Sequence, residues 1–268
     1  MGIRIGNVVF DAPGATLDQY DRSAGGIAQL YAELLGMRLV SRGAWYREQG
    51  WDGADDGDEV DPLVFAADGR APNIAFECET GEYHAPTWPD PERPQQVHVD
   101  IVVPDLSTAE EIVLRRGGAR LAGNGDGGRD HRVYADCVGH PFCLYLDASA
   151  DTPRIERIVF DCFSPRSVAR FWSELMNMPV RVVDTAERVE IARADGSRPN
   201  LAFQHSLSPM PRWPDPARPQ QIHLDLAADD EAAAQARAVD LGAARLTYLG
   251  GGVVFADPSG HPFCLGDG

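Results

Sequence analysis

Two stretches of this chain repeat almost letter for letter. Residues 88–100 read WPDPERPQQVHVD and residues 213–225 read WPDPARPQQIHLD, with ten of thirteen positions identical at an offset of 125 residues. A shorter block, GHPFCL, occurs at 139–144 and again at 260–265, at an offset of 121 residues. Offsets of this size, in the same order along the chain, indicate the tandem duplication of one domain rather than a solenoid of short units.

The duplication divides the 268 residues into two domains of ordinary size, which we predict at residues 1–149 and 153–268. A short polar linker, SADTP at 149–153, joins them. Each domain is long enough to bury a hydrophobic core without disulfides. The five cysteines are odd in number, and the sequence shows no signal peptide and no apolar run of membrane-spanning length. We therefore expect reduced thiols and a cytoplasmic location.

The charge of the chain excludes some functions. The formal net charge is −17, and all 24 residues counted as lysine or arginine are arginines. A chain without lysine cannot form a Schiff base, and an acidic chain is poorly suited to nucleic acid or to an anionic membrane. We interpret the charge mainly as a source of solubility and expect residues 52–61 to form a solvated loop. The exclusive use of arginine also suggests a GC-rich bacterial genome.

The apolar pattern predicts the same order of elements in both domains. In the second domain we expect a helix at 164–176, capped by Ser164 with proline at its first position, and a second helix at 230–241. The strands expected there are 155–161, 180–184, 189–193, 200–204, 221–226, 245–249, 253–257 and 263–265. The elements expected in the first domain are strands at 3–10, 74–77 and 97–103 and helices at 27–35 and 108–116. The first domain also contains two insertions, which we expect to be loops, at 12–26 and 48–61.

Two βαβββ modules per domain, closed by the segment DPSGHPFCL at 257–265, resemble the vicinal oxygen chelate superfamily of glyoxalases, extradiol dioxygenases and bleomycin-resistance proteins. The resemblance implies an α+β fold of two tandem domains, each with two modules that form a cupped mixed sheet with helices outside. It leaves the reaction open, because one scaffold can host many functions.

In that family, metal ligands project into the cup from four strands, usually as two histidines and two glutamates. The positions that the resemblance implies in the first domain are Asn7, Glu77, His98 and Cys143. Three of these residue types can bind zinc, but asparagine is a poor ligand and a buried, inert cysteine is common. We therefore assign no metal and no cofactor.

The corresponding positions of the second domain are Arg157, Gln204, His223 and Cys264. A fixed arginine at the first position would repel a divalent metal, so we expect none there. The guanidinium of Arg157 would suit an anionic or carbonyl oxygen of a ligand. The alternative is a surface ion pair with Asp161 or Asp225.

Each repeated motif also pairs a histidine with an aspartate. Period-two alternation places Asp100 on the strand face of His98, and Asp225 on that of His223. Such a carboxylate can raise the basicity of an imidazole, as for a general base, but the presence of the pair in both domains favours a structural role equally.

The aromatic residues of the repeats have two possible roles. Trp88 and Trp213 lie in proline-rich loops and could stack on a planar ligand or pack between the domains. We expect the matched aromatics of the first helices and closing strands to be core residues, and GGG at 250–252 to be a turn. These aromatics are Tyr31, Trp172, Phe142 and Phe263.

Three functions follow from these patterns. The first is metal-independent binding of a small planar or oxygen-rich molecule, as in the resistance branch of the family. The second is a metal-assisted or histidine-based lyase or isomerase that uses His98, Asp100 and Glu77 in the cup of the first domain. The third is a structural or interaction module with filled cups. We expect a small molecule as partner and a monomer or homodimer as the assembly. The expected ligand-binding residues are Asn7, Trp88, Cys143, Arg157, Gln204, Trp213, His223, Asp225 and Cys264.

Overall fold

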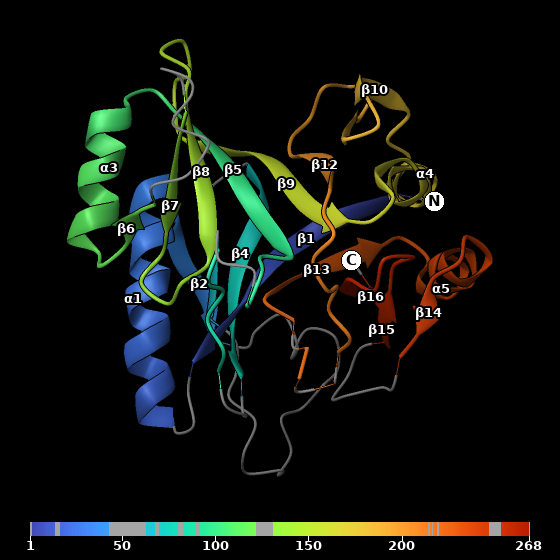
Figure 1. Cartoon of the computed structure of the whole chain (residues 1–268), viewed down its shortest axis with the longest axis horizontal. Helices are drawn as coiled ribbons and strands as arrows, with labels where there is room; N and C mark the ends of the chain where they lie inside the picture. The colour runs from blue at the N-terminus through green and yellow to red at the C-terminus, as the bar shows by residue number, and fades with distance from the viewer. Residues whose placement is uncertain are drawn as a thin grey trace.

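The computed structural model describes residues 2–13, 17–42, 63–67, 70–79, 83–88, 92–121, 131–213, 215, 217–218, 220–246 and 253–267. These residues form two eight-stranded mixed sheets with four helices outside them (Figure 1). This arrangement confirms the predicted α+β fold of two tandem domains. The loop expected at 52–61 and the turn expected at 250–252 lie outside the described residues.

Each sheet joins a module from the first half of the chain to a module from the second half. Sheet A has the order β14 (Ala244–Arg245), β15 (Val253–Ala256), β16 (Pro262–Asp267), β13 (Ile222–Ala228), β1 (Ile3–Pro13), β4 (Arg70–Glu79), β3 (Leu63–Ala67) and β2 (Arg38–Arg42). Sheet B has the order β10 (Val180–Asp184), β11 (Arg188–Ala192), β12 (Asn200–His205), β9 (Arg154–Cys162), β5 (Val97–Val103), β8 (Pro141–Leu146), β7 (His131–Ala135) and β6 (Ala119–Arg120). The antiparallel pairs β1–β13 and β5–β9 join the halves.

The combination of modules from both halves in one sheet determines which candidate residues lie close together. Grouping the candidate positions within one half of the chain is wrong, because β1 and β4 share a sheet with β13 and β16 rather than with β5 and β8. The connections explain the pairing. Only residues 147–153 separate β8 from β9, which favours placing both strands in one sheet, on either side of β5. The longer connection from β4 to β5 allows the chain to enter the other sheet.

The helices lie on the outer faces of the sheets. In Figure 1, α1 (Leu17–Leu35) and α3 (Leu106–Arg115) lie together on one side of the molecule, and α4 (Pro165–Met176) and α5 (Glu231–Asp240) on the other. Asp105 caps α3, since its carboxylate accepts hydrogen bonds from the backbone N–H groups of Ser107 and Thr108. Ser164 occupies the N-cap of α4, but its side chain makes no capping hydrogen bond.

The segment expected to be a loop before the first helix is instead strand and helix. β1 continues to Pro13 and α1 already begins at Leu17, so the expectation of a loop at 12–26 is wrong, and the additional residues lengthen the strand and the helix instead. Gly25 and Gly26 suggest a loop because each glycine inside a helix costs about 1 kcal/mol. Burial of Ile27, Leu30 and Tyr31 on the following turns offsets this cost.

The core lies between the sheets and their helices. The four aromatics predicted to be core residues are fully or almost fully buried: Tyr31, Phe142, Trp172 and Phe263. Tyr31 contacts Phe142 with ring centroids 5.7 Å apart, and Trp172 contacts Phe263 at 5.2 Å. Because β-strand side chains alternate, the residues between these core positions point away from the helices. We call that side of each sheet its inner face.

The repeated GHPFCL block forms a tight turn before the last strand of each half. In the second half, the Asp257 carboxylate accepts hydrogen bonds from the backbone N–H groups of Ser259 and His261. Gly260 has a φ of +95°, and a Cβ added there would lie 2.8 Å from the carbonyl oxygen of Pro211. The glycine is thus required both by its backbone conformation and by its contact.

Gly260→Ala is expected to lower the free energy of unfolding by about 2–3 kcal/mol, because an unfavourable left-handed conformation adds to the collision with Pro211. Gly242→Ala is the matched control, since Gly242 has a φ of +107° and open space around its Cβ position. Chemical denaturation should show a larger loss for Gly260→Ala. Equal losses would mean that the contact with Pro211 carries no strain.

Candidate functional site

Sheet A brings one group of candidate residues together on its inner face. The strand register places Asn7 of β1 opposite Asp225 of β13, Asp225 beside Cys264 of β16, and Asp11 beside Glu77 of β4. His223 lies two residues before Asp225 and therefore on the same face. We call this group the sheet A site; its residues are Asn7, Asp11, Glu77, His223, Asp225 and Cys264.

His223 is at the centre of the sheet A site. Its Nε2 lies 3.5 Å from Oδ1 of Asp225 and 3.9 Å from Oε2 of Glu77, and its Nδ1 lies 3.9 Å from Oδ1 of Asp11. The amide of Asn7 donates a hydrogen bond to Oδ2 of Asp225 at 2.9 Å. All of these side chains except Glu77 are at least nine-tenths buried, whereas the Glu77 side chain is 30% exposed.

Electrostatics at the sheet A site favour a positive charge. Burial lowers the pKa of His223, but the side chains of Asp225, Cys264 and Glu77 raise it by more, so that the pKa stands well above the usual value. Burial also raises the pKa of the Cys264 thiol to about 11. Without a metal, an imidazolium at His223 partly neutralises the surrounding carboxylates.

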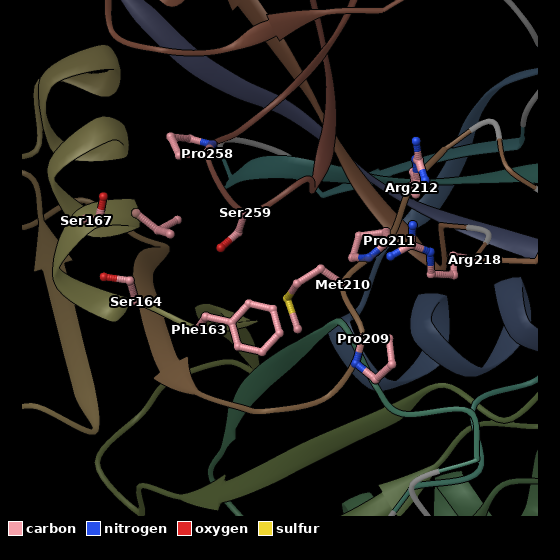
Figure 2. Close-up of a pocket in the computed structure, with 11 residues that line it drawn as sticks. Phe163, Ser164, Ser167, Pro209, Met210, Pro211, Arg212, Arg218, Pro258 and Ser259 are labelled. Atoms are coloured by element: carbon pink, nitrogen blue, oxygen red, sulfur yellow. The ribbon is translucent and has the colours of Figure 1, made fainter.

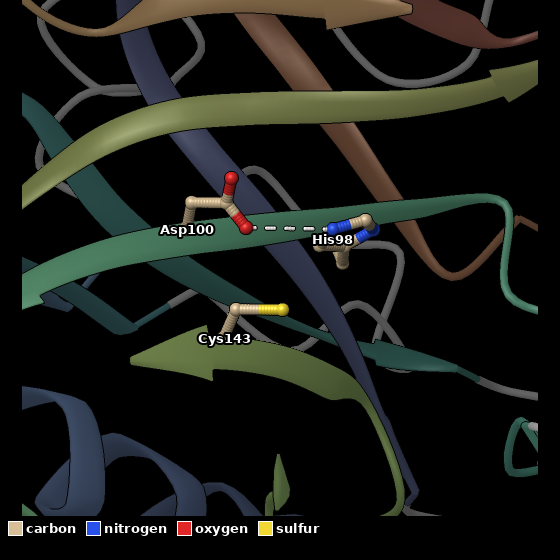
Figure 3. Close-up of side chains that lie close together, drawn as sticks. All are labelled: His98, Asp100 and Cys143. Carbon is tan, nitrogen blue, oxygen red and sulfur yellow. Dashed lines mark ion pairs between the residues drawn. The ribbon is translucent and has the colours of Figure 1, made fainter. Parts of the chain in front are cut away.

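Sheet B places the equivalent residues on its own inner face. Arg157 of β9 lies opposite Asp100 of β5, Asp100 lies beside Cys143 of β8, and Asp161 lies beside Gln204 of β12. Figure 3 shows His98, Asp100 and Cys143 converging from two neighbouring strands. We call this group the sheet B site; its residues are His98, Asp100, Cys143, Arg157, Asp161 and Gln204.

An arginine neutralises the central carboxylate of the sheet B site. Nε of Arg157 donates a hydrogen bond to Oδ2 of Asp100 at 2.8 Å, and Nε2 of His98 lies 3.5 Å from Oδ1 of the same carboxylate (Figure 3). The guanidinium of Arg157 also lies over the ring of Tyr145, 4.7 Å from its centroid. The alternative prediction, in which Arg157 forms a surface ion pair with Asp161 or Asp225, is therefore wrong.

The protonation states at the sheet B site follow from this pairing. Burial raises the pKa of Asp100, but His98 and Arg157 lower it by more, to about 2. Burial lowers the pKa of His98, but Asp100 and Cys143 raise it by more, to about 10. At neutral pH His98 is thus an imidazolium, as His223 is in the sheet A site, and each must lose a proton before it can act as a base or bind a metal.

The sites differ in charge at their matched positions. The sheet A site has three carboxylates and no arginine, whereas the sheet B site has two carboxylates and one arginine. With histidine and cysteine counted as neutral, the sheet A site therefore carries two more negative charges. The differences that produce this are Asn7 in place of Arg157 and Glu77 in place of Gln204.

The donors of the sheet A site fit a divalent metal. One ligand atom each from Asp11, Glu77 and His223 lies within 4.8 Å of the others, and the same holds for His223, Asp225 and Cys264. Asn7 Oδ1 and Asp225 Oδ1 are buried and have no hydrogen-bond partner. Carboxylate, imidazole and thiolate are the ligand types of zinc and related metals.

The sheet B site fits a metal less well, although one ligand atom each from His98, Asp100 and Cys143 also lies within 4.8 Å of the others. Arg157 holds a fixed positive charge against Asp100, and Gln204 donates a hydrogen bond to Asp161 at 2.6 Å instead of offering a carboxylate. A dication would have to displace the arginine from a buried ion pair.

Trp88 and Trp213 lie in turns and are half-buried. Neither belongs to the sheet A or sheet B site, so their role as ligand-stacking or packing residues stays a prediction. Sequence reasoning did not find Asp11 or its equivalent Asp161. Both lie four residues after the first candidate position of their strand, Asn7 and Arg157, and period-two alternation from those positions could have found them.

These features define a tandem protein of the vicinal oxygen chelate superfamily, in which paired βαβββ modules present side chains on the inner faces of two sheets. The family described as glyoxalase-like domain matches residues 15–145 and 157–266, and the chain belongs to this family. No curated protein sequence matches the chain.

Solved structures show the same fold. Glyoxalase I from Zea mays is 16% identical, with a TM-score of 0.63 over 99% of this chain and 92% of that chain. A Bacillus subtilis protein assigned provisionally as a dioxygenase is also 16% identical, with a TM-score of 0.62 over 98% of this chain and 84% of that chain. At these identities the likeness establishes the fold alone.

Among the described residues, no helix is both long and apolar enough to cross a membrane.

Proposed function

We propose that this glyoxalase-like protein is a metal-assisted enzyme that acts on a small oxygen-rich molecule at the sheet A site. The observation that carries the proposal is that the arginine of the Arg157–Asp100 ion pair in sheet B is replaced in sheet A by the uncharged amide of Asn7, which leaves the negative charge of Asp225 without a cationic guanidinium beside it. The sheet A site lacks the arginine that would compete with a dication, and it has the additional carboxylate of Glu77.

Glu77 and His223 are the residues best placed to hold the metal, with Asp11, Asp225 and Cys264 as the other donors in reach. A bound divalent ion supplies Lewis acidity, which polarises a carbonyl or hydroxyl oxygen of the substrate. The metal-assisted alternative was predicted for the cup of the first domain, with His98. It is now assigned to the sheet A site, whose residues come from both halves of the chain.

The other residues of the sheet A site position these donors. Asn7 holds the Asp225 carboxylate through its amide, and Asp225 in turn orients the His223 ring. Glu77 has the most exposed carboxylate of the group, so it is the carboxylate that can exchange a proton with a molecule entering from solvent. A metal ion that polarises a substrate oxygen and a carboxylate that exchanges a proton suit a lyase or isomerase. In such a reaction a proton is removed from, or added to, a carbon atom next to the polarised oxygen group.

Metal binding is expected to strengthen as the pH rises. Because the pKa of His223 stands well above its usual value, the imidazole is protonated at neutral pH and must lose that proton to become a ligand. One released proton makes the affinity increase by about tenfold per pH unit while His223 remains protonated in the metal-free protein.

Calorimetric titration of chelator-stripped protein with zinc, nickel, manganese and cobalt at pH 6, 7 and 8 measures this dependence. Proton release can be obtained from the same titrations in buffers of different ionisation enthalpy. A metal that binds without proton release would overturn the role of His223, and the absence of binding by every metal would overturn the proposed function.

Metal-independent binding of a planar or oxygen-rich molecule is a second candidate function, favoured by the sheet B site. Arg157 and Arg188 both approach Asp100, at 2.8 and 3.9 Å, and their side chains are 18% and 31% exposed. Two guanidinium groups at one point can hold a carboxylate or carbonyl oxygen. Binding of such a ligand in the presence of chelator should weaken in Arg188→Gln, and binding unchanged by this substitution would exclude the sheet B site.

A further inference from the structure

A pocket of about 340 Å³ lies away from both inner-face sites, at the beginning of α4. Figure 2 shows Ser164 and Ser167 of α4 and Ser259 of the β15–β16 turn on one side of it, and Arg212 and Arg218 on the other. Phe163 and Met210 lie between them in this view. None of the residues of the sheet A or sheet B site lines this pocket.

Ser208 and His261 are not among the lining residues, but Met210 and Ser259, two positions from them in the sequence, are. The sequence repeat shows what stands at the equivalent positions of the first half. At the offset of the WPDP repeat, Ser208 corresponds to Tyr83. The Tyr83 hydroxyl donates a hydrogen bond to the carbonyl oxygen of Val138 at 3.0 Å and lies 3.3 Å from Nε2 of His140. At the offset of the GHPFCL repeat, Val138 and His140 correspond to Ser259 and His261. A tyrosine of the chain thus occupies one half, and a serine stands at its position in the other.

His261 retains the polar atom that the tyrosine satisfies in the first half. Its Nδ1 lies 3.3 Å from Asp257, as Nδ1 of His140 lies 3.1 Å from Asp136, so the two rings are held in the same way. Nε2 of His261 is buried and has no hydrogen-bond partner, and the residue is 1% exposed. A buried, unpaired ring nitrogen is costly, and its counterpart bonds a phenolic hydroxyl.

The far side of the pocket carries positive charge. Among the described residues, no carboxylate pairs with the guanidinium of Arg212 or Arg218, although most other arginines with described surroundings form ion pairs or hydrogen bonds. In addition, α4 has no acidic residue in its first turn, and the side chain of its N-cap Ser164 accepts no capping hydrogen bond. In a chain with a net charge of −17, this is a local site for an anion.

We propose that this pocket binds a small hydroxylated aromatic acid whose phenol takes the place of the missing tyrosine side chain. The ring packs on Phe163 and Met210, and the hydroxyl reaches past the lining residues to bond the buried Nε2 of His261 and the carbonyl oxygen of Ser259. The carboxylate pairs with Arg212 and Arg218. The site is separate from the proposed metal site, so it can serve as a second binding site of the same protein.

Calorimetric titration of the full chain in the presence of chelator tests the proposal with three probes. We expect 4-hydroxyphenylacetate to bind, and phenylacetate, which lacks the hydroxyl, and 4-hydroxyphenethyl alcohol, which lacks the carboxylate, to bind at least about tenfold more weakly. Equal affinities for the three probes, or no binding of 4-hydroxyphenylacetate, would overturn the proposal. Chelator keeps this outcome independent of the metal site.

Two variants locate the binding site. Ser208→Tyr installs the tyrosine of the first half and should abolish binding, whereas Ser197→Tyr, at an exposed position, should leave it unchanged. Arg218→Gln should weaken binding by about tenfold, with the exposed Arg181→Gln as the control for lost charge. Arg218→Gln keeps the test decisive if Ser208→Tyr does not fold. Full binding by a folded Ser208→Tyr protein, or by Arg218→Gln, would contradict the assignment.

Discussion

Arg157→Asn is expected to lower the free energy of unfolding by about 3 kcal/mol at pH 7, because it leaves a buried carboxylate without its main partner. Asp100 is 1% exposed, and Nε of Arg157 donates a hydrogen bond to it at 2.8 Å. Asparagine is the residue at the matched position of sheet A, so the substitution is compatible with the strand. His98 and Arg188 remain near Asp100 and keep the loss below that of an isolated buried charge.

The loss should shrink in acid. The pKa of Asp100 in the folded protein is about 2, below its usual value, so the stability from this ion pair is present above about pH 4 and is lost as the pH falls toward 2. Urea denaturation at pH 7 and at pH 3 measures both effects. Arg166→Asn is the control, because its ion pair with Asp184 is exposed and should contribute less than about 1 kcal/mol. Similar losses in the two variants would show that the Arg157 pair is no stronger than a surface pair.

The double substitution Asn7→Arg with Glu77→Gln is expected to weaken metal binding by more than about a hundredfold, because it gives the sheet A site the charge of the sheet B site. The arginine would pair with Asp225 as Arg157 pairs with Asp100. Competition with a zinc-chelating dye measures the affinity. The single variants divide the effect between the added cation and the lost carboxylate.

The exposed double variant Glu174→Gln with Glu187→Gln serves as the control for general changes in surface charge, because it removes two negative charges and so makes the same change in net charge. It should leave the affinity for zinc unchanged. An Asn7→Arg, Glu77→Gln protein that folds and binds zinc as tightly as the unsubstituted protein would show that the metal lies elsewhere or that charge does not select the site.

The sequence repeat predicted the tandem duplication, and the resemblance to the vicinal oxygen chelate superfamily implied the α+β fold with its mixed sheets. The strands of the second half were predicted within a few residues, for example β10 at 180–184 and β13 beginning near Gln221. The beginning of α1 was not predicted, since glycine lowers the local helix signal and only tertiary packing restores it.

The composition of the two sites could not be predicted from one sequence. Both halves carry the same strand pattern, so pairing β1 with β13 and pairing β1 with β5 satisfy the same alternation of polar and apolar residues. Only the short connection between β8 and β9 distinguishes these arrangements. Its consequence, that the strands on either side of it share sheet B, is known only from the structure. For this reason His98 was grouped with Asn7, although it lies in the same sheet as Arg157.

The partner of Arg157 illustrates the same limit. Strand alternation placed it on the inner face, but its pairing with Asp100 depends on the register between β9 and β5. The choice between ligand-binding arginine and ion-paired arginine was therefore open until the register was known. The structure establishes the ion pair, and the exposed part of the guanidinium leaves room for the second candidate function.

Metal content tests the central claim, that the two sites have diverged so that only the sheet A site holds a metal. Protein purified without chelator and offered zinc, nickel, manganese and iron(II) can be measured by mass spectrometry, alongside His223→Ala and His98→Ala. We expect one metal per chain in the unsubstituted protein and in His98→Ala, and none in His223→Ala. No metal in the unsubstituted protein, two metals per chain, or loss of the metal in His98→Ala would contradict the claim.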